Sequence, residues 1–521
     1  MPTAASPPCP PALAPPLETA DAPPPGPVPA FAGNVRALFL GGIGTGAVRG
    51  IRSVVLSRLL GPAGYGLLDL AIFFSRSVAS LSRIGLADAT VRFGAGLDAP
   101  RARAFALRAA AAVALAAAAF APLGALLAAP ALGRVAPHPA LVAAAAFAAI
   151  PPIAVGDVAR AYLLARQNFA TPARIGFATA LASFALEAAA LLAGLGVPGV
   201  LAASLLASVG ALAAYARAWR NDREKGGPGS TAPAVSEVAR YAAARFALGA
   251  LTLVTWTRFE VVFLGALWSA SEVAFYALPF GVVGAAVELV PGSISAVLPA
   301  AYPERRARGG EAAAAELYGR AFFQMAAVGL PLAAIGALLA RPLVSLVFSE
   351  RYLPSAPVVG ILAVGAVLSI VSSAASHLIL SSSKAPWMLL VAGAGAAANL
   401  ALDFAWIPRG GALGASWANT TAQVFESAVV VGAAAALFGA KPPLRRLAAL
   451  LPGLAACAGV GALGARLFQE NAALCAGLCV PAMAAAYFFV GRATGVFRGV
   501  DREVLRALVP LPGVRPPPPR A

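Results

Sequence analysis

Long apolar stretches separated by short polar loops recur along almost the whole chain. Each stretch has about 20 residues and few charges, which is the length that a helix needs to cross the hydrocarbon core of a bilayer. Because backbone polar groups in lipid must be satisfied within the protein, we predict that these stretches are helices. About fourteen spans are expected, at residues 36–60, 64–86, 104–129, 140–165, 172–195, 198–219, 240–267, 272–300, 319–340, 357–380, 386–407, 411–437, 447–467 and 471–492.

A polar stretch near the middle divides these spans into two sets. Residues 221–236 (NDREKGGPGSTAPAVS) are rich in Gly, Pro and charge, as a connector would be. The two sets also show a weak internal similarity, between LLGPAGYGLLDLAIFFSRSV in the first and FLGALWSASEVAFYALPFGVV in the second. Repeated halves are common in transporters. We predict an all-α polytopic membrane protein with two six-helix lobes, 36–220 and 237–439, around a central cavity, and two additional helices at 440–492.

The two ends of the chain lack apolar runs. Residues 1–35 are rich in proline, so we predict a disordered cytoplasmic tail rather than a cleaved signal peptide, and 493–521 form a second such tail. Four scattered cysteines do not form a disulfide framework. No cofactor, metal site or catalytic residue is expected.

The basic residues indicate topology rather than nucleic-acid binding. The net charge is +17, but charged residues make up only 12% of a chain that is 60% hydrophobic. Lys and Arg gather in alternate loops, which the positive-inside rule places in the cytoplasm together with both termini. These loops carry Arg92, Arg101, Arg103, Arg166, Arg220, Arg223, Lys225, Arg305, Arg306, Arg308, Lys384, Lys441, Arg445 and Arg446.

Several stretches occur in a characteristic order along the chain. They are LSRLLGPAGYG and IGLADATVRFGA in the first lobe, and SASEVAFYALPFG, AVLPAAYPE, RPLVSLVFSERYLPSAPVVGIL and AANLALDFAWIPRGGALGASWANTTAQ in the second. In order and spacing they resemble the oligosaccharide flippase family of the multidrug/oligosaccharidyl-lipid/polysaccharide (MOP) exporter superfamily. The resemblance covers about Arg36 to Gly439.

The resemblance implies alternating access and an undecaprenyl-pyrophosphate-linked oligosaccharide as cargo. It places the chain in the bacterial inner membrane, with membrane lipids and the lipid-linked glycan as partners. A polysaccharide polymerase and glycosyltransferases are expected in the same pathway. The additional helices at 440–492 lie beyond the shared part.

Ionisable residues inside the predicted spans are the candidates for a site, because each costs about 2.5 to 3.5 kcal/mol at a helix centre. They are therefore expected to face a cavity or a partner. As a substrate-binding set for pyrophosphate we predict Arg49, Arg52, Arg76 and Arg258, and as coupling or pairing acids Asp69, Glu260 and Glu288.

The alternative is that the arginines pair with these acids and only join helices. Glu187, Asp403 and Glu426 are isolated acids, for which a hydrogen bond between helices competes with a proton or sodium site. Asp157 and Arg160 are expected to form a local or interfacial pair.

Three other functions compete with the flippase. A multidrug/cation antiporter of the same superfamily would favour acids over arginines in its cavity. A membrane glycan polymerase or ligase would need a sizeable outward loop, and the predicted outward loops are short. The third is a scaffold, a family member that has lost transport activity, and the sequence does not distinguish it from a flippase.

Overall fold

The computed structural model describes residues 28–221, 233–256, 258–289 and 291–499. Regular secondary structure within these ranges is helical throughout, without a strand, which confirms the all-α prediction. Most of the predicted tails and linker lies outside the described residues, namely 1–27, 222–232 and 500–521. Residues 28–35, expected in the tail, belong to the first helix.

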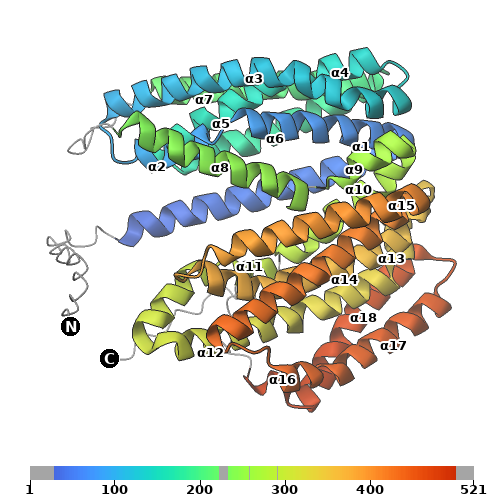
Figure 1. Cartoon of the computed structure of the whole chain (residues 1–521). Helices are drawn as coiled ribbons and strands as arrows, with labels where there is room; N and C mark the ends of the chain where they lie inside the picture. The colour runs from blue at the N-terminus through green and yellow to red at the C-terminus, as the bar shows by residue number, and fades with distance from the viewer. Residues whose placement is uncertain (1–27, 222–232, 257, 290, 500–521) are drawn as a thin grey trace, which may run out of the picture.

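The helices of the N-terminal part lie together in the upper half of Figure 1. They are α1 (Val28–Ser82), α2 (Leu86–Gly94), α3 (Ala99–Val135), α4 (Pro139–Phe147), α5 (Ile150–Ala165), α6 (Ala170–Leu192) and α7 (Gly196–Arg220). The first part of α1 runs between the two halves of the picture, and its second part returns after a break at Gly61. The φ of Gly61 is +67°, a conformation that side chains other than glycine rarely adopt.

Two helices follow, α8 (Val235–Trp256), which slopes from beside α2 toward the middle of Figure 1, and α9 (Glu260–Leu267), which lies between α1 and α10 in that view. The lower half holds α10 (Ala270–Leu289), α11 (Pro291–Ser295), α12 (Leu298–Leu338), α13 (Ala340–Val347), the short 3-10 helix η1 (Glu350–Ser355), α14 (Ala356–Leu380) and α15 (Trp387–Phe438). At its far edge lie α16 (Leu444–Ala448), α17 (Leu451–Leu467), α18 (Ala472–Ala493) and η2 (Val496–Gly499).

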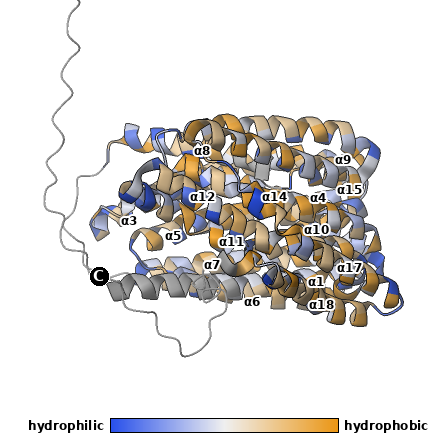
Figure 2. Cartoon of the chain, turned by 90° about the horizontal axis from the view of Figure 1, so that it is seen from below, coloured by the Kyte–Doolittle hydropathy of each residue, from blue (hydrophilic) through white to orange (hydrophobic). Residues whose placement is uncertain are grey.

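Among the described residues, 11 helical stretches are long and apolar enough to cross a membrane. The helix bodies are hydrophobic and hydrophilic residues gather at their two ends (Figure 2), as expected for a multi-pass membrane protein. The α1 and α15 stretches each pass through two predicted spans, with breaks at Gly61 and Gly411. The predicted seventh span is divided into α8 and α9 and is not among the 11, so the count of about fourteen stays a prediction.

The two halves are closed against each other at the end that holds α13 and η1. The Tyr352 hydroxyl donates to the backbone oxygen of Ser57 at 2.8 Å, and both groups are buried. Arg58 donates to the backbone oxygens of Val347, at 2.9 Å, and Leu346. Contacts of the part of α1 before Gly61 with α13 and η1 therefore form a closed end, which we call the η1 latch.

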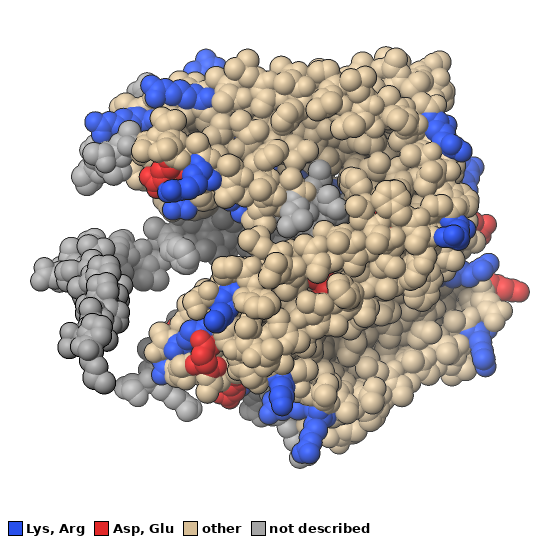
Figure 3. All heavy atoms as spheres, viewed as in Figure 1, with Lys and Arg blue, Asp and Glu red and all other residues tan. Residues whose placement is uncertain are grey.

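A second contact between the halves joins α8 to α2. Arg245 pairs with Asp88 at 3.1 Å, and the Arg92 guanidinium lies 4.6 Å from the centre of the Tyr241 ring. Opposite the η1 latch, the described atoms of the upper and lower halves part from each other (Figure 3). The contacts between the halves are thus unequal at the two ends of the bundle.

Candidate functional site

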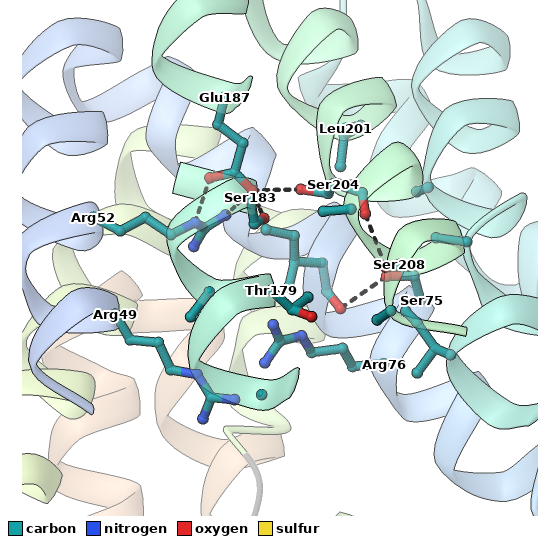
Figure 4. A pocket seen from close by; sticks show the side chains of 18 of the residues that line it. Arg49, Arg52, Ser75, Arg76, Thr179, Ser183, Glu187, Leu201, Ser204 and Ser208 are labelled. Carbon is teal, nitrogen blue, oxygen red and sulfur yellow. Dashed lines mark hydrogen bonds and ion pairs between the residues drawn. The ribbon is translucent and has the colours of Figure 1, made fainter. Parts of the chain in front are cut away.

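A cavity of about 230 Å³ lies among α1, α4, α5, α6 and α7. Its lining residues fall between Val48 and Tyr215, so it belongs to the N-terminal half alone. Figure 4 shows its polar side chains from close by. They are Arg49, Arg52, Ser75, Arg76, Thr179, Ser183, Glu187, Ser204, Ser208 and Tyr215.

One arginine of the cavity is paired. Arg52 forms a two-pronged ion pair with Glu187, with a distance of 3.1 Å from Nη2 to Oε1 and a second, shorter contact from Nε. The hydroxyls of Ser183 and Ser204 also donate to Oε1, at 2.7 and 2.6 Å. Glu187 is fully buried. This carboxylate therefore joins α1, α6 and α7, which is the helix-joining role that the sequence left open for it.

The other two arginines of the cavity are free. Within the described residues, Arg49 and Arg76 make no hydrogen bond or ion pair, and both side chains are exposed to the cavity. They come from the two parts of α1 and extend toward the same region in Figure 4. With Arg52 and Glu187, the cavity contains three positive groups and one negative group, which leaves two positive charges uncompensated. Such a site favours an anion.

The fourth predicted arginine lies elsewhere. Arg258 does not line this cavity, and its Nη1 donates to both carboxylate oxygens of Asp69, at 3.0 and 3.1 Å. The pair bridges α1 and the turn before α9, which are far apart in sequence. This is the pairing that the sequence allowed as the alternative to substrate binding. It leaves Arg49, Arg52 and Arg76 as the arginines of the site.

A second group of polar residues surrounds Glu260 inside the C-terminal half. Glu260 and Asp403 have exposed fractions of 1% and 0%. The Asn399 amide donates to both carboxylates at 3.4 Å, and Asn419 donates to Glu260 at 2.9 Å. No basic side chain pairs with either acid in the described part of the chain. Two buried carboxyl groups that share a hydrogen-bond donor and have no basic partner repel each other when both are ionised, so such a site favours a proton or a bound cation.

Neither asparagine was selected from the sequence. The i,i+4 spacing of Asn399 and Asp403 places both on one face of an apolar helix, and this signal was available. Asn419 follows after the turn at Gly411, and only the fold brings it back to the same place.

For two acids, the structure differs from what the sequence led us to expect. Asp157 pairs with Arg83 at 3.2 Å, and not with Arg160 as expected, because the end of the second part of α1 lies beside α5. Glu288 is exposed on α10 and pairs with no arginine within the described residues.

The long apolar helices of the described residues define a class of protein, the multi-pass membrane proteins. Residues 55–357, more than half of the chain, match the family described as "Polysaccharide biosynthesis protein". The chain belongs to this family. No curated protein sequence matches the chain.

Solved structures of the MOP superfamily have the same fold. An inward closed structure of the lipid II flippase MurJ is similar with a TM-score of 0.67 and 12% identity, covering 90% of this chain and 99% of that one. An inward-facing multidrug resistance MATE transporter has a TM-score of 0.56 and 16% identity, with coverages of 75% and 95%. A MOP superfamily transporter from Pyrococcus furiosus has 0.53 and 15%, with coverages of 78% and 96%. The fold is that of MOP superfamily transporters and flippases.

Proposed function

We propose that this protein is a flippase that moves a lipid-linked oligosaccharide of the undecaprenyl-pyrophosphate type across the bacterial cytoplasmic membrane. The observation that carries the proposal is the pair of unpaired guanidinium groups, Arg49 and Arg76, which face one cavity. A pyrophosphate offers several oxygen acceptors, and the planar fork of arginine matches them well. Membership in the polysaccharide biosynthesis family supports a glycan as cargo.

The rival within the same fold is a multidrug/cation antiporter. A cationic drug entering this cavity would meet two uncompensated positive charges, and in a site of low dielectric such repulsion is strong. The one acid of the cavity, Glu187, is already occupied by Arg52, Ser183 and Ser204. The charge of the cavity therefore favours the flippase over the antiporter.

Transport by this fold requires the closed end to open. The η1 latch joins α1 to η1 through the Ser57–Tyr352 hydrogen bond and to α13 through the Arg58–Val347 hydrogen bond. In alternating access, the two halves rock against each other, so these contacts break while others form at the opposite end. The cargo headgroup would leave the cavity when the latch is open.

The buried acids supply a way to drive this motion. A proton or monovalent cation that binds between Glu260 and Asp403 removes the repulsion between two carboxylates, so its binding stabilises one arrangement of the surrounding helices. We assign the coupling role to this pair. Asp69 is placed among the structural residues because Arg258 neutralises it.

Deletion of the gene tests the proposed function. Lipid-linked oligosaccharide should accumulate on the cytoplasmic leaflet, and one surface polysaccharide should disappear, while sensitivity to cationic drugs stays unchanged. Intact surface glycans together with drug accumulation in the deletion strain would mean that the antiporter interpretation is correct. Genes for a polymerase and glycosyltransferases next to this one would identify the pathway.

A further inference from the structure

A separate cavity of about 380 Å³ lies where the beginning of α8 meets α2 and α3. Its wall is largely apolar, and it also contains two arginines, Arg101 and Arg108. The apolar part includes Leu86, Leu97, Phe105, Val235 and Val238. None of its lining residues belongs to the cationic cavity of the N-terminal half.

The two arginines lie on one face of α3. They are seven residues apart, which is about two helical turns and about 10 Å along the axis. Arg101 pairs with Asp98 at 3.5 Å at the beginning of the helix. Arg108 lies deeper, within the membrane-spanning stretch Ala99–Val135, and makes no hydrogen bond or ion pair in the described part of the chain.

An arginine inside a membrane span without an acid is unfavourable unless its guanidinium reaches the membrane interface or an anion from outside the chain reaches it. A soluble anion would satisfy Arg108 but would gain nothing from the apolar wall. A neutral lipid would use the wall but not the arginines. An amphiphile with an anionic head uses both, and basic cavities between helices near the cytoplasmic surface are known to suit such headgroups.

We propose that this cavity binds an anionic phospholipid, with its phosphate at Arg108 and Arg101 and its upper acyl chains against Phe105 and Val238. The predicted topology places the site in the cytoplasmic leaflet, where α3 and α8 begin. Figure 3 shows basic side chains gathered at this end of α3, with few acids beside them. The proposal does not depend on the identity of the transported cargo.

A lipid in this cavity would affect the contact between the two halves. The cavity is built from α2 and α3 on one side and from the beginning of α8 on the other. The same helices are joined by the Arg245–Asp88 pair and by Arg92 over Tyr241. A ligand that binds only when α8 lies against α2 stabilises that arrangement by mass action. Anionic lipid therefore favours the state described by this structure.

The test uses the purified full-length protein in a neutral detergent. Phosphatidylglycerol is titrated, with phosphatidylcholine as the lipid control, and binding is followed by thermal stabilisation. The apparent affinity for phosphatidylglycerol should fall about fivefold in Arg108→Gln, as expected for one basic residue near an anionic headgroup. Arg174→Gln is the matched control, because Arg174 is also exposed and unpaired near a helix beginning but does not line the cavity.

A second variant tests the contribution of the cavity's space to lipid binding separately from that of the arginines' charge. Ala104→Trp fills the cavity and leaves both arginines in place, so it should abolish the response to phosphatidylglycerol. A photoreactive phosphatidylglycerol on the wild-type protein should label α3 or the beginning of α8, a measurement that does not require any variant to fold. Equal weakening by Arg108→Gln and Arg174→Gln, full competition by inorganic phosphate, or labelling confined to other helices would each overturn the proposal.

Discussion

Arg52 and Arg76 face the same cavity, yet replacing them should have opposite consequences. Arg52 is held by Glu187, whose carboxylate is fully buried, whereas Arg76 is unpaired within the described residues and exposed to the cavity. The same substitution, Arg→Gln, therefore tests a structural role at one position and a cargo-binding role at the other. Both variants remove one positive charge and keep a polar, shorter side chain.

The expected changes in stability and in transport rate follow from what surrounds each arginine. Arg52→Gln leaves a buried carboxylate without its cation, which typically destabilises a protein by about 3 to 5 kcal/mol. Arg76→Gln removes a largely desolvated charge that has three like-charged neighbours, Arg49, Arg52 and Arg258, and one opposite neighbour, Asp69, which Arg258 already pairs, so stability should stay the same or rise. A hydrogen bond to a charged group contributes about 1.5 to 3 kcal/mol. Loss of the contact between Arg76 and a pyrophosphate should thus slow transport about tenfold to a hundredfold.

Two measurements on each variant separate these effects. Thermal unfolding in detergent should show a loss of several degrees for Arg52→Gln and none for Arg76→Gln. Transport of a lipid-linked glycan by equal amounts of folded protein should fall sharply for Arg76→Gln. The assignment fails if Arg76→Gln is unstable, or if it is stable and transports at the wild-type rate. Arg174→Gln, outside the cavity, serves as the control for both measurements.

Three further outcomes are expected. Glu260→Gln and Asp403→Asn should keep the protein folded but remove the acceleration of transport by an imposed proton or sodium gradient; an unchanged response of both variants would rule out the coupling role. Cysteines at Ser57 and Tyr352, joined by a short thiol cross-linker in a background without native cysteines, should stop transport until the linker is cleaved, and normal transport by the cross-linked protein would show that the latch does not open. Phosphatase reporters fused at Gly227 and after the C-terminus should be inactive, because the loop arginines place both sites in the cytoplasm; an active reporter at either site would reverse the topology.

The helical membrane fold could be predicted from the sequence because hydropathy and span length are local properties. The limit of about 20 residues per span applies to each stretch by itself, and the charge of each loop can be read directly. One predicted span is divided into α10 and α11, and Pro291 begins the second of these helices. The predicted seventh span is divided into α8 and α9 without a proline between residues 256 and 260. Local chemistry in the sequence therefore accounts for one of these breaks and not for the other.

The partners of the buried charges could not be predicted in the same way. Arg52 and Glu187 are separated by 135 residues, and Arg258 and Asp69 by 189. No spacing rule connects residues on different helices, so the sequence could state only that each arginine needs a cavity or an acid. The fold distinguishes the two cases by pairing Arg52 and Arg258 and leaving Arg49 and Arg76 free.

The central claim is that the cationic cavity carries a lipid-linked pyrophosphate glycan, and transport in proteoliposomes tests it most directly. The purified protein is reconstituted with a fluorescent undecaprenyl-pyrophosphate oligosaccharide, and the fraction that becomes accessible on the opposite leaflet is measured over time. We expect transbilayer movement with the wild-type protein, at least a tenfold slower rate with Arg76→Gln, and no effect of cationic dyes as competitors. Movement that is equally fast with Arg76→Gln, or that cationic dyes abolish, would contradict the account.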